Sequence, residues 1–311
     1  MTDIRTVPLG GQEESSRLMP VTLVLAGMSA QQLGSAVAAL LFPMVGAAGM
    51  VALRQLMSAL VLLAVCRPVL RGYSRGDWAV ICGFGLALAA MNGLFYQAVA
   101  RIPLGAAVTL EVLGPLGLSV VAGRRPVSAL WAALALAGVA LLGRGGLTQL
   151  TGSGVAFALG AGAMWAVYIL ASKQAGTRFP GADGLALAMA VAAVVSLPIG
   201  IADAGGALLR PEALGAGLAV ALLCSAVPYT LELLALRRLS AGAFGVLLSL
   251  SPALAALAGF TVLDQQLSPA QMLAIALVVV ACTGAVRTGG SGARSPRHDR
   301  VGTRVRRGAD R

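Results

Sequence analysis

Residues 78–99 read WAVICGFGLALAAMNGLFYQAV, which is 22 consecutive residues without a charged side chain. A helix needs about 20 mainly apolar residues to cross a hydrocarbon core of about 30 Å. Lipid offers no hydrogen bonds to the backbone, so such a segment must satisfy its own peptide groups. The abundance of Ala, Leu and Gly, with little alternation, favours a helix over a strand. This stretch is therefore predicted to be a transmembrane helix.

Similar apolar stretches recur along the whole chain. The expected spans are residues 21–42, 47–66, 78–99, 103–122, 128–143, 153–173, 183–202, 213–235, 241–262 and 269–286. The composition agrees, because 58% of the residues are hydrophobic and 11% are charged, against roughly 45–50% and 25% in soluble domains. We predict an all-α polytopic membrane protein with ten transmembrane helices.

Basic residues alternate sharply between the loops that join these spans. With a cytoplasmic N-terminus, 19 of the 23 basic residues fall in inner segments, Arg101, Arg144 and Arg210 fall outside, and Arg54 falls within a helix. The positive-inside rule then places both termini in the cytoplasm. Topology thus explains the net charge of +11, and no nucleic-acid partner is expected. The arginine-rich tail, residues 287–311, either grips anionic lipid or, more simply, is a disordered topology anchor.

The chain repeats itself at a displacement of 137 residues. This register places Phe42-Pro43 on Phe179-Pro180, Ser35 on Ser172, Arg101 on Arg238, Gly105-Ala106 on Gly242-Ala243, and Pro115 on Pro252. The expected halves are residues 21–146 and 152–286, preceded by the cytoplasmic segment 1–20. Each half holds five spans, so the second half enters the membrane with opposite polarity. Such inverted repeats are typical of secondary transporters, and a duplication kept only for packing is the alternative.

Two prolines and one stripe of small residues predict details of helix packing. Pro115 and Pro252 each fall in the middle of a span, where the missing N–H and the ring break or kink a helix. Carbonyl groups freed there are expected to face a cavity. Gly154, Ala158, Gly162 and Ala166 form one face of a helix and predict close packing against a neighbour.

Arg54 and Glu111 are the most informative polar residues, because a charge at the membrane centre costs at least about 2.5–3.5 kcal/mol on insertion scales. Glu111 follows Pro103 by eight residues, which places it about 12 Å into the core. We interpret Glu111 as the site of a substrate ammonium or a proton, since burial favours its neutral form. Arg54 is then the partner of a substrate carboxylate. A purely structural pair between the two is the alternative.

Further candidate binding residues are hydrogen-bonding side chains concentrated in four of the spans. They are Gln31, Gln32, Ser35, Asn92, Tyr96, Gln97, Trp165, Tyr168 and Tyr229. Each one alone is more often a contact between helices than a ligand contact. Glu232 joins this set, although its position near Arg237 also fits the cytoplasmic interface.

Several motifs of other protein classes are absent from the sequence. It contains no GxxxxGK[ST] phosphate loop and no HExxH, and its only histidine is His298 in the tail. These absences exclude ATP-driven pumping by this chain and zinc catalysis. The four cysteines are widely separated and lie in or beside apolar spans, so neither disulfides nor a metal site is expected. We expect no catalytic residue, no metal and no cofactor.

A series of short motifs, in order along residues 20–286, carries a family resemblance. They are LFP at 41–43, VALR at 51–54, MNGLFY at 91–96, IPLG at 102–105, LE at 110–111, GRRPV at 123–127, AMWAVYIL at 163–170 and PYTLE at 228–232. Together they resemble the EamA-type transporters of the drug/metabolite transporter superfamily, in particular those that export threonine and homoserine across the inner membrane.

The resemblance implies two inverted five-helix repeats around a central cavity that opens to one side at a time. It also implies proton-coupled efflux of small metabolites, often amino acids, and it makes Arg54, Glu111 and Glu232 family charges. The chain departs from that pattern at Ser251, where the exporters carry an acidic residue, and at Gln265-Gln266, which replaces a Gly-Glu pair. These departures leave the substrate and the coupling stoichiometry open.

We therefore expect a multi-pass inner-membrane antiporter that exports a threonine-like amino acid, with Glu111 binding the substrate ammonium and a proton in turn. Its partners are the amino acid, protons and membrane lipids, and a homodimer is left open. A transporter of another metabolite or of a lipophilic cation is the first alternative. A non-transporting scaffold and an intramembrane enzyme are alternatives of other classes, although no catalytic constellation supports the enzyme.

Overall fold

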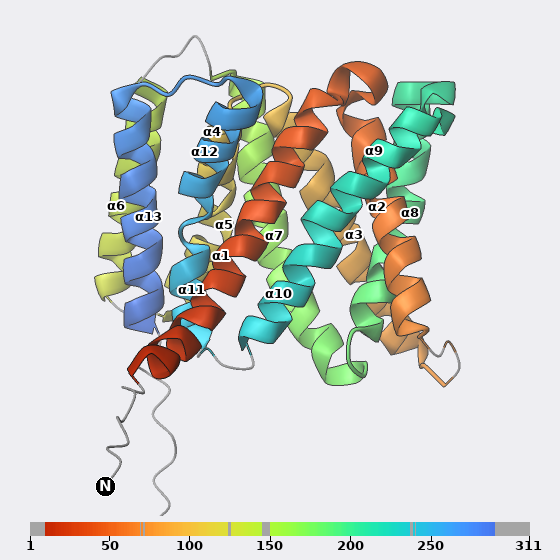
Figure 1. Ribbon diagram of the computed structural model, residues 1–311, viewed down its shortest axis with the longest axis horizontal. Coiled ribbons are helices and arrows are strands. Elements are labelled where there is room, and N and C mark those ends of the chain that lie inside the picture. The colour runs from red at the N-terminus through yellow and green to blue at the C-terminus, as the bar shows by residue number, and fades with distance from the viewer. Residues whose placement is uncertain are drawn as a thin grey trace, which may run out of the picture.

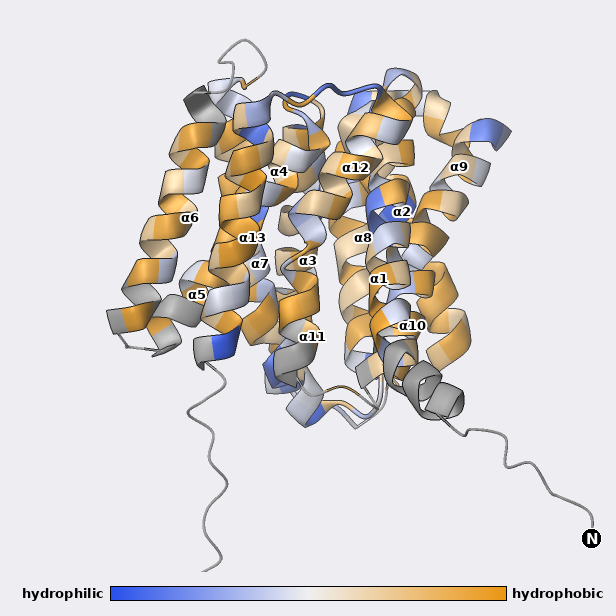
Figure 2. Ribbon diagram, turned by 60° about the vertical axis from the view of Figure 1, so that its left-hand side comes forward, coloured by the Kyte–Doolittle hydropathy of each residue, from blue (hydrophilic) through white to orange (hydrophobic). Residues whose placement is uncertain are grey.

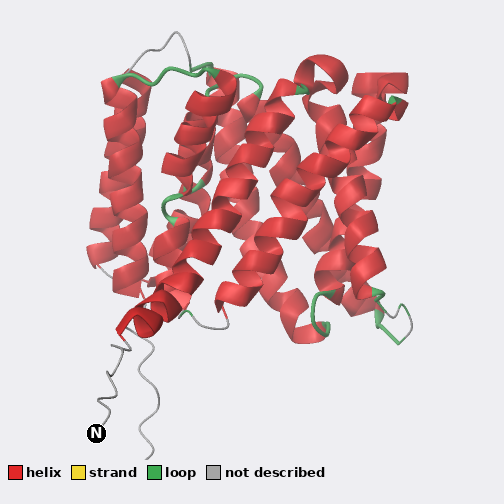
Figure 3. Ribbon diagram, viewed as in Figure 1, coloured by secondary structure: helices red, strands yellow, loops and turns green. Residues whose placement is uncertain are grey.

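The computed structural model describes residues 10–68, 70, 72–123, 126–144, 150–236, 239 and 241–289. Within these ranges the chain is helical and contains no strand, as Figure 3 shows. The helices of the first half are α1 (Gly10–Leu40), α2 (Phe42–Cys66), α3 (Arg75–Val99), α4 (Leu104–Glu111), α5 (Leu113–Gly123) and α6 (Pro126–Arg144).

The second half contains the same kinds of element with more interruptions. They are α7 (Gly152–Arg178), α8 (Asp183–Ala204), a 3-10 turn (Gly205–Leu209), α9 (Pro211–Ala221), a π-helical turn (Leu222–Ala226), α10 (Val227–Leu236), α11 (Ala241–Leu248), α12 (Ser251–Leu263) and α13 (Pro269–Gly289). Figure 1 shows the start of α1 and the end of α13 at the same end of the helix bundle.

The helices have the length and surface of a multi-pass membrane protein. Seven helical segments in the described part of the chain are long and apolar enough to cross a membrane, and three shorter apolar helices accompany them. Large apolar side chains face outward along the bundle, among them Leu136, Val194 and Ile199. Figure 2 shows that hydrophobic residues predominate along the helices. Outward-facing apolar side chains are what a hydrocarbon surrounding requires.

The two mid-span prolines coincide with helix breaks. α4 ends at Glu111, four residues before Pro115, and α11 ends at Leu248, four residues before Pro252. A proline ring clashes with the carbonyl four residues earlier and cannot return its hydrogen bond. The helix therefore stops at that carbonyl and restarts around the proline, which lies in the first turn of α5 and of α12.

Close approaches between helices depend on residues without large side chains. A Cβ on Gly105 of α4 would lie 2.9 Å from the Cα of Ala256 in α12. A Cβ on Gly154 of α7 would lie 2.6 Å from a methyl group of Ile102. Gly154, Ala158 and Gly162 are buried, which confirms the close packing predicted for them, whereas Ala166 is only half-buried.

Helix ends extend beyond the expected apolar spans. The helix α1 begins at Gly10, eleven residues before the expected span at 21, and α7 continues to Arg178 instead of residue 173. Polar residues such as Glu13 and Gln174 are good helix formers. Hydropathy marks where a helix is apolar, whereas the helix itself continues until its backbone hydrogen bonds are interrupted.

Candidate functional site

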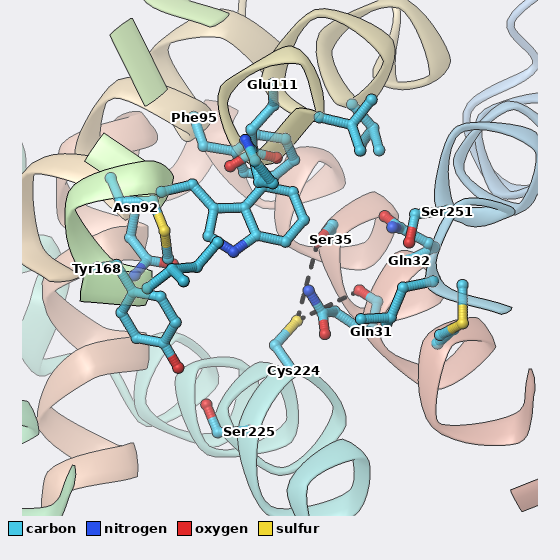
Figure 4. A pocket seen from close by; sticks show the side chains of 18 of the residues that line it. Gln31, Gln32, Ser35, Asn92, Phe95, Glu111, Tyr168, Cys224, Ser225 and Ser251 are labelled. Atoms are coloured by element: carbon cyan, nitrogen blue, oxygen red, sulfur yellow. Dashed lines mark hydrogen bonds between the residues drawn. The ribbon is translucent and has the colours of Figure 1, made fainter. Parts of the chain in front are cut away.

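A cavity of about 420 Å³ lies inside the bundle, between the two helix breaks. Its walls come from α1, α2, α3, α4, α5, α7, α8, α11, α12, α13 and the π-helical turn. Both Glu111 and Leu248, the residues at which α4 and α11 end, line it. Figure 4 shows side chains from several helices converging on this space.

Arg54 of α2 provides the positive charge on the wall of the cavity. Its guanidinium donates hydrogen bonds to the Tyr96 hydroxyl at 3.3 Å and to the Cys224 carbonyl at 3.4 Å. It also lies 5.6 Å from the centre of the Tyr96 ring, within the range of a cation–π contact. Tyr96 itself is 1% exposed and packs against Phe42 and Phe95. Tyr96 therefore lies behind Arg54 and holds it, while Arg54 faces the cavity.

Glu111 provides an ionisable carboxyl group on the wall of the same cavity. Within the described part of the chain no hydrogen bond reaches its carboxylate, and its charged neighbour is Arg54. Its backbone is held tightly, since Gly162 of α7 packs directly against the Glu111 peptide. The backbone of Glu111 is thus held in place, and its carboxylate remains available to an incoming hydrogen-bond donor.

Polar groups of α1 and of the π-helical turn face these two charges. Gln31, Gln32 and Ser35 line the cavity. The Cys224 thiol lies 3.5 Å from the carbonyl of Gln31 and 4.0 Å from the Ser35 hydroxyl, and Figure 4 shows these contacts. A π-helical turn is uncommon and frequently marks a functional site. Here it turns the Cys224 carbonyl toward Arg54.

The remaining wall combines aromatic and other apolar side chains with one amide. Trp165 and Tyr168 come from α7, and Phe95 and Met91 come from α3. Asn92 donates to the carbonyl of Leu88 in its own helix at 2.9 Å and lines the cavity as well. Such a wall suits the apolar part of a small ligand.

The structure therefore brings most of the sequence-predicted site residues to one cavity. Those that line it are Glu111, Arg54, Asn92, Gln31, Trp165, Tyr168 and Pro115. Tyr96 lies behind the wall, as described above, and Pro252 is buried beside it. The side chains of Tyr229 and Glu232 lie outside the part that the structure describes, although both belong to α10.

Three buried polar residues of the wall were not singled out from the sequence. Gln55 accepts a hydrogen bond from Ser196 of α8 at 2.6 Å and donates to the carbonyl of Leu88 at 3.4 Å. Ser58 donates to Ser225 at 2.9 Å. One signal was available, because Ser58 follows Arg54 by four residues and so shares its helix face.

The cavity reaches toward the end of the bundle at which α13 ends. Its walls include Val286, near the end of α13. At the opposite end Ile102 and Leu104 are buried, and the Gln265 side chain accepts a hydrogen bond from the Leu104 N–H at 3.0 Å. These contacts pack the described residues tightly at the end remote from the start of α1.

Known proteins match the chain in sequence and in fold. Residues 152–287 match the EamA-like transporter family. The threonine/homoserine exporter RhtA of Salmonella typhimurium strain SL1344 is 40% identical over 87% of this chain and 92% of its own length. RhtA of Escherichia coli K12 is 39% identical over the same shares. A solved crystal structure matches with a TM-score of 0.60 and 21% identity, over 87% of this chain and 98% of that one.

Proposed function

Because the chain belongs to the EamA-like transporter family, we propose that it is a secondary transporter that exports threonine, homoserine or similar small amino acids in exchange for protons. The observation that carries this proposal is the pair of opposite charges, Arg54 and Glu111, on the wall of one cavity inside apolar helices. A zwitterionic amino acid offers a carboxylate to the first and an ammonium to the second.

The chemistry of Glu111 supports coupling to protons. Its carboxylate receives no hydrogen bond from the described residues, so either a proton or a substrate ammonium can occupy it. The two occupants exclude each other because both neutralise the same charge. Outward passage with the amino acid and return with the proton then couple the two fluxes.

Helix boundaries support two inverted five-helix repeats. Displaced by 137 residues, the start of α4 at Leu104 falls on the start of α11 at Ala241, and its end at Glu111 falls on the end of α11 at Leu248. In this proposal α4 with α5, α9 with α10, and α11 with α12 each form one interrupted span. The total is then ten spans, and the second half is inverted relative to the first.

The position of the cavity supports an alternating-access mechanism. In this proposal the structure represents the inward-facing state. The charge pattern of the loops favours a cytoplasmic location for both termini in this proposal. The cavity reaches toward Val286 at that end, while Gln265 and Leu104 close the other end. Export then requires the contacts at the closed end to separate as those near α13 come together.

Efflux from vesicles tests the proposal directly. Purified protein is reconstituted into proteoliposomes loaded with radiolabelled threonine or homoserine, and the external medium is made acidic. We expect the pH gradient to accelerate efflux, the lumen to acidify as substrate leaves, and a protonophore to abolish the acceleration. Chromatography of the released label must return unaltered amino acid. Efflux equal to that of protein-free vesicles, for every amino acid tried, refutes the transporter, and a covalently changed product indicates an enzyme.

A further inference from the structure

The serine pair Ser58 and Ser225 joins two helices at the cavity wall. Ser58 of α2 donates a hydrogen bond to Ser225 of the π-helical turn at 2.9 Å. Both residues are 2% exposed, and both line the cavity. Two hydroxyl groups of a membrane protein that bond across helices often serve only to hold them together. Because both also line the cavity, their hydroxyl groups lie within reach of a ligand there.

The pair has hydrogen-bonding capacity left over after its mutual bond. A serine hydroxyl offers one donor and two acceptor positions. Ser225 receives the hydrogen of Ser58, and no acceptor for its own hydrogen lies within reach among the described residues. The pair therefore presents one donor together with acceptor positions, which is the complement of another hydroxyl group.

The neighbouring Gln55 does not offer the same capacity. Gln55 uses its amide oxygen for Ser196 and its amide nitrogen for the Leu88 carbonyl. Its amide is thus fixed between α2, α3 and α8 as a structural strut. These two hydrogen bonds hold the part of α2 that carries Ser58. The serine pair therefore keeps hydrogen-bonding capacity that Gln55 lacks.

The pair also lies beside the group that is expected to hold the substrate carboxylate. Ser58 follows Arg54 by one helical turn on the same face of α2, and Ser225 directly follows Cys224, whose carbonyl accepts a hydrogen bond from Arg54. Figure 4 shows Ser225 next to Cys224, on the side of the cavity away from Glu111. A short substrate side chain next to the carboxylate at Arg54 is thereby brought toward the serine pair.

We propose that Ser58 and Ser225 are specificity-determining residues that recognise the side-chain hydroxyl of the transported amino acid. This inference rests on the proposed function, because it assigns a group of the proposed substrate to a place in the proposed site. An amino acid without the hydroxyl leaves the Ser225 donor unpaired in a buried place, and such an unpaired group lowers affinity. The pair thus selects threonine over valine, which has a methyl group in place of the hydroxyl.

Counterflow in proteoliposomes measures this selection as the ratio of threonine to valine transport. In Ser225→Ala and in Ser58→Ala we expect the ratio to fall by about three- to tenfold, as the loss of one neutral hydrogen bond implies, mainly through slower threonine transport. The control is Ser172→Ala in α7, which removes a hydroxyl that bonds to the Ile169 carbonyl of its own helix and does not line the cavity. Its ratio should equal that of the wild type.

Each other result of this experiment counts against the inference in a recognisable way. An unchanged ratio in both serine variants refutes it and leaves the proposed function standing. An equal loss of threonine and valine transport shows that the pair is only a contact between helices, and also refutes it. A wild-type protein that transports no amino acid overturns the proposed function first and the inference with it.

Discussion

Gly162 of α7 lies directly against the backbone of Glu111, so that a Cβ at position 162 would come within 2.5 Å of the Glu111 carbonyl oxygen. Distances below 3.0 Å are not found for real Cβ atoms, and here the obstacle is backbone. The helix α4 ends at Glu111 because of Pro115, and its carbonyl is free of the α-helical bond that Pro115 cannot make. Gly162 therefore sets where the end of α4, and with it the carboxylate, can lie.

Replacing Gly162 by alanine should displace the end of α4. We expect Gly162→Ala to lose most transport activity and to unfold at a lower temperature, with a cost of about 1–3 kcal/mol typical of overpacking. Efflux assays and thermal unfolding in detergent measure the two effects. Gly176→Ala is the matched control on the same helix, since a Cβ there meets nothing within 4 Å. Normal activity and normal unfolding in Gly162→Ala would show that the contact relaxes without consequence.

Replacing Glu111 by glutamine should separate substrate binding from proton coupling. The amide cannot take up or release a proton, so we expect Glu111→Gln to abolish pH-driven efflux while the protein remains in the membrane. In the wild type, acidity on the substrate side should raise the apparent KM, because protons compete for the carboxylate, and this dependence should vanish in the variant. Glu111→Asp keeps the acid and should retain partial coupling. Undiminished proton-coupled export by Glu111→Gln would refute the role.

Replacing Arg54 by lysine should weaken recognition of the substrate carboxylate. The guanidinium reaches Tyr96 and Cys224 together, and one ammonium group cannot reproduce that planar fork. We expect Arg54→Lys to raise the apparent KM for threonine by at least about tenfold, as for a hydrogen bond to a charged group. Tyr96→Phe keeps the ring beneath Arg54 and should have a smaller effect. Equal losses for threonine and for its amino-alcohol analogue, which lacks the carboxylate, would argue against direct contact.

Replacing Gln265 by alanine should loosen the closed end of the bundle. The Leu104 N–H at the start of α4 would lose its acceptor, at a cost of about 1 kcal/mol. We expect the cavity to open more often on the face opposite the chain termini. Labelling of Cys224 by an impermeant maleimide from that face, with the other cysteines replaced, should become several-fold faster. Gln266→Ala, at an exposed neighbouring residue, should label as the wild type does, and equal rates in both variants would exclude this contact from the closure.

The helical class and most of the cavity followed from the sequence because both depend on the cost of polar groups in lipid. Glu111, Arg54 and Asn92 are expensive in an apolar span, so they had to face a common interior, and they do line one cavity. The breaks at Pro115 and Pro252 followed from the chemistry of the ring. These predictions needed no knowledge of which helices are neighbours.

The parts that the sequence did not reveal depend on tertiary contacts. Ser58 and Ser225 resemble any serine in an apolar helix until α2 and the π-helical turn are placed side by side. The π-helical turn itself has no motif that marks it. Tyr96 was expected to touch substrate, but its ring and hydroxyl are occupied by Arg54, and only the packing of α2 against α3 shows this.

The two proline breaks are alike in backbone and unlike in charge, because α4 ends at Glu111 and α11 ends at Leu248. In the proposed antiport, with Glu111 as the proton carrier and no acidic residue at the matched position, we expect one proton to exchange for each neutral zwitterion, so that every turnover moves one positive charge into the cell. Its work is then electrogenic. The membrane voltage then adds about 2.3 kcal/mol per 100 mV to the driving force of each cycle. Export therefore continues even when the internal pH equals that of the medium.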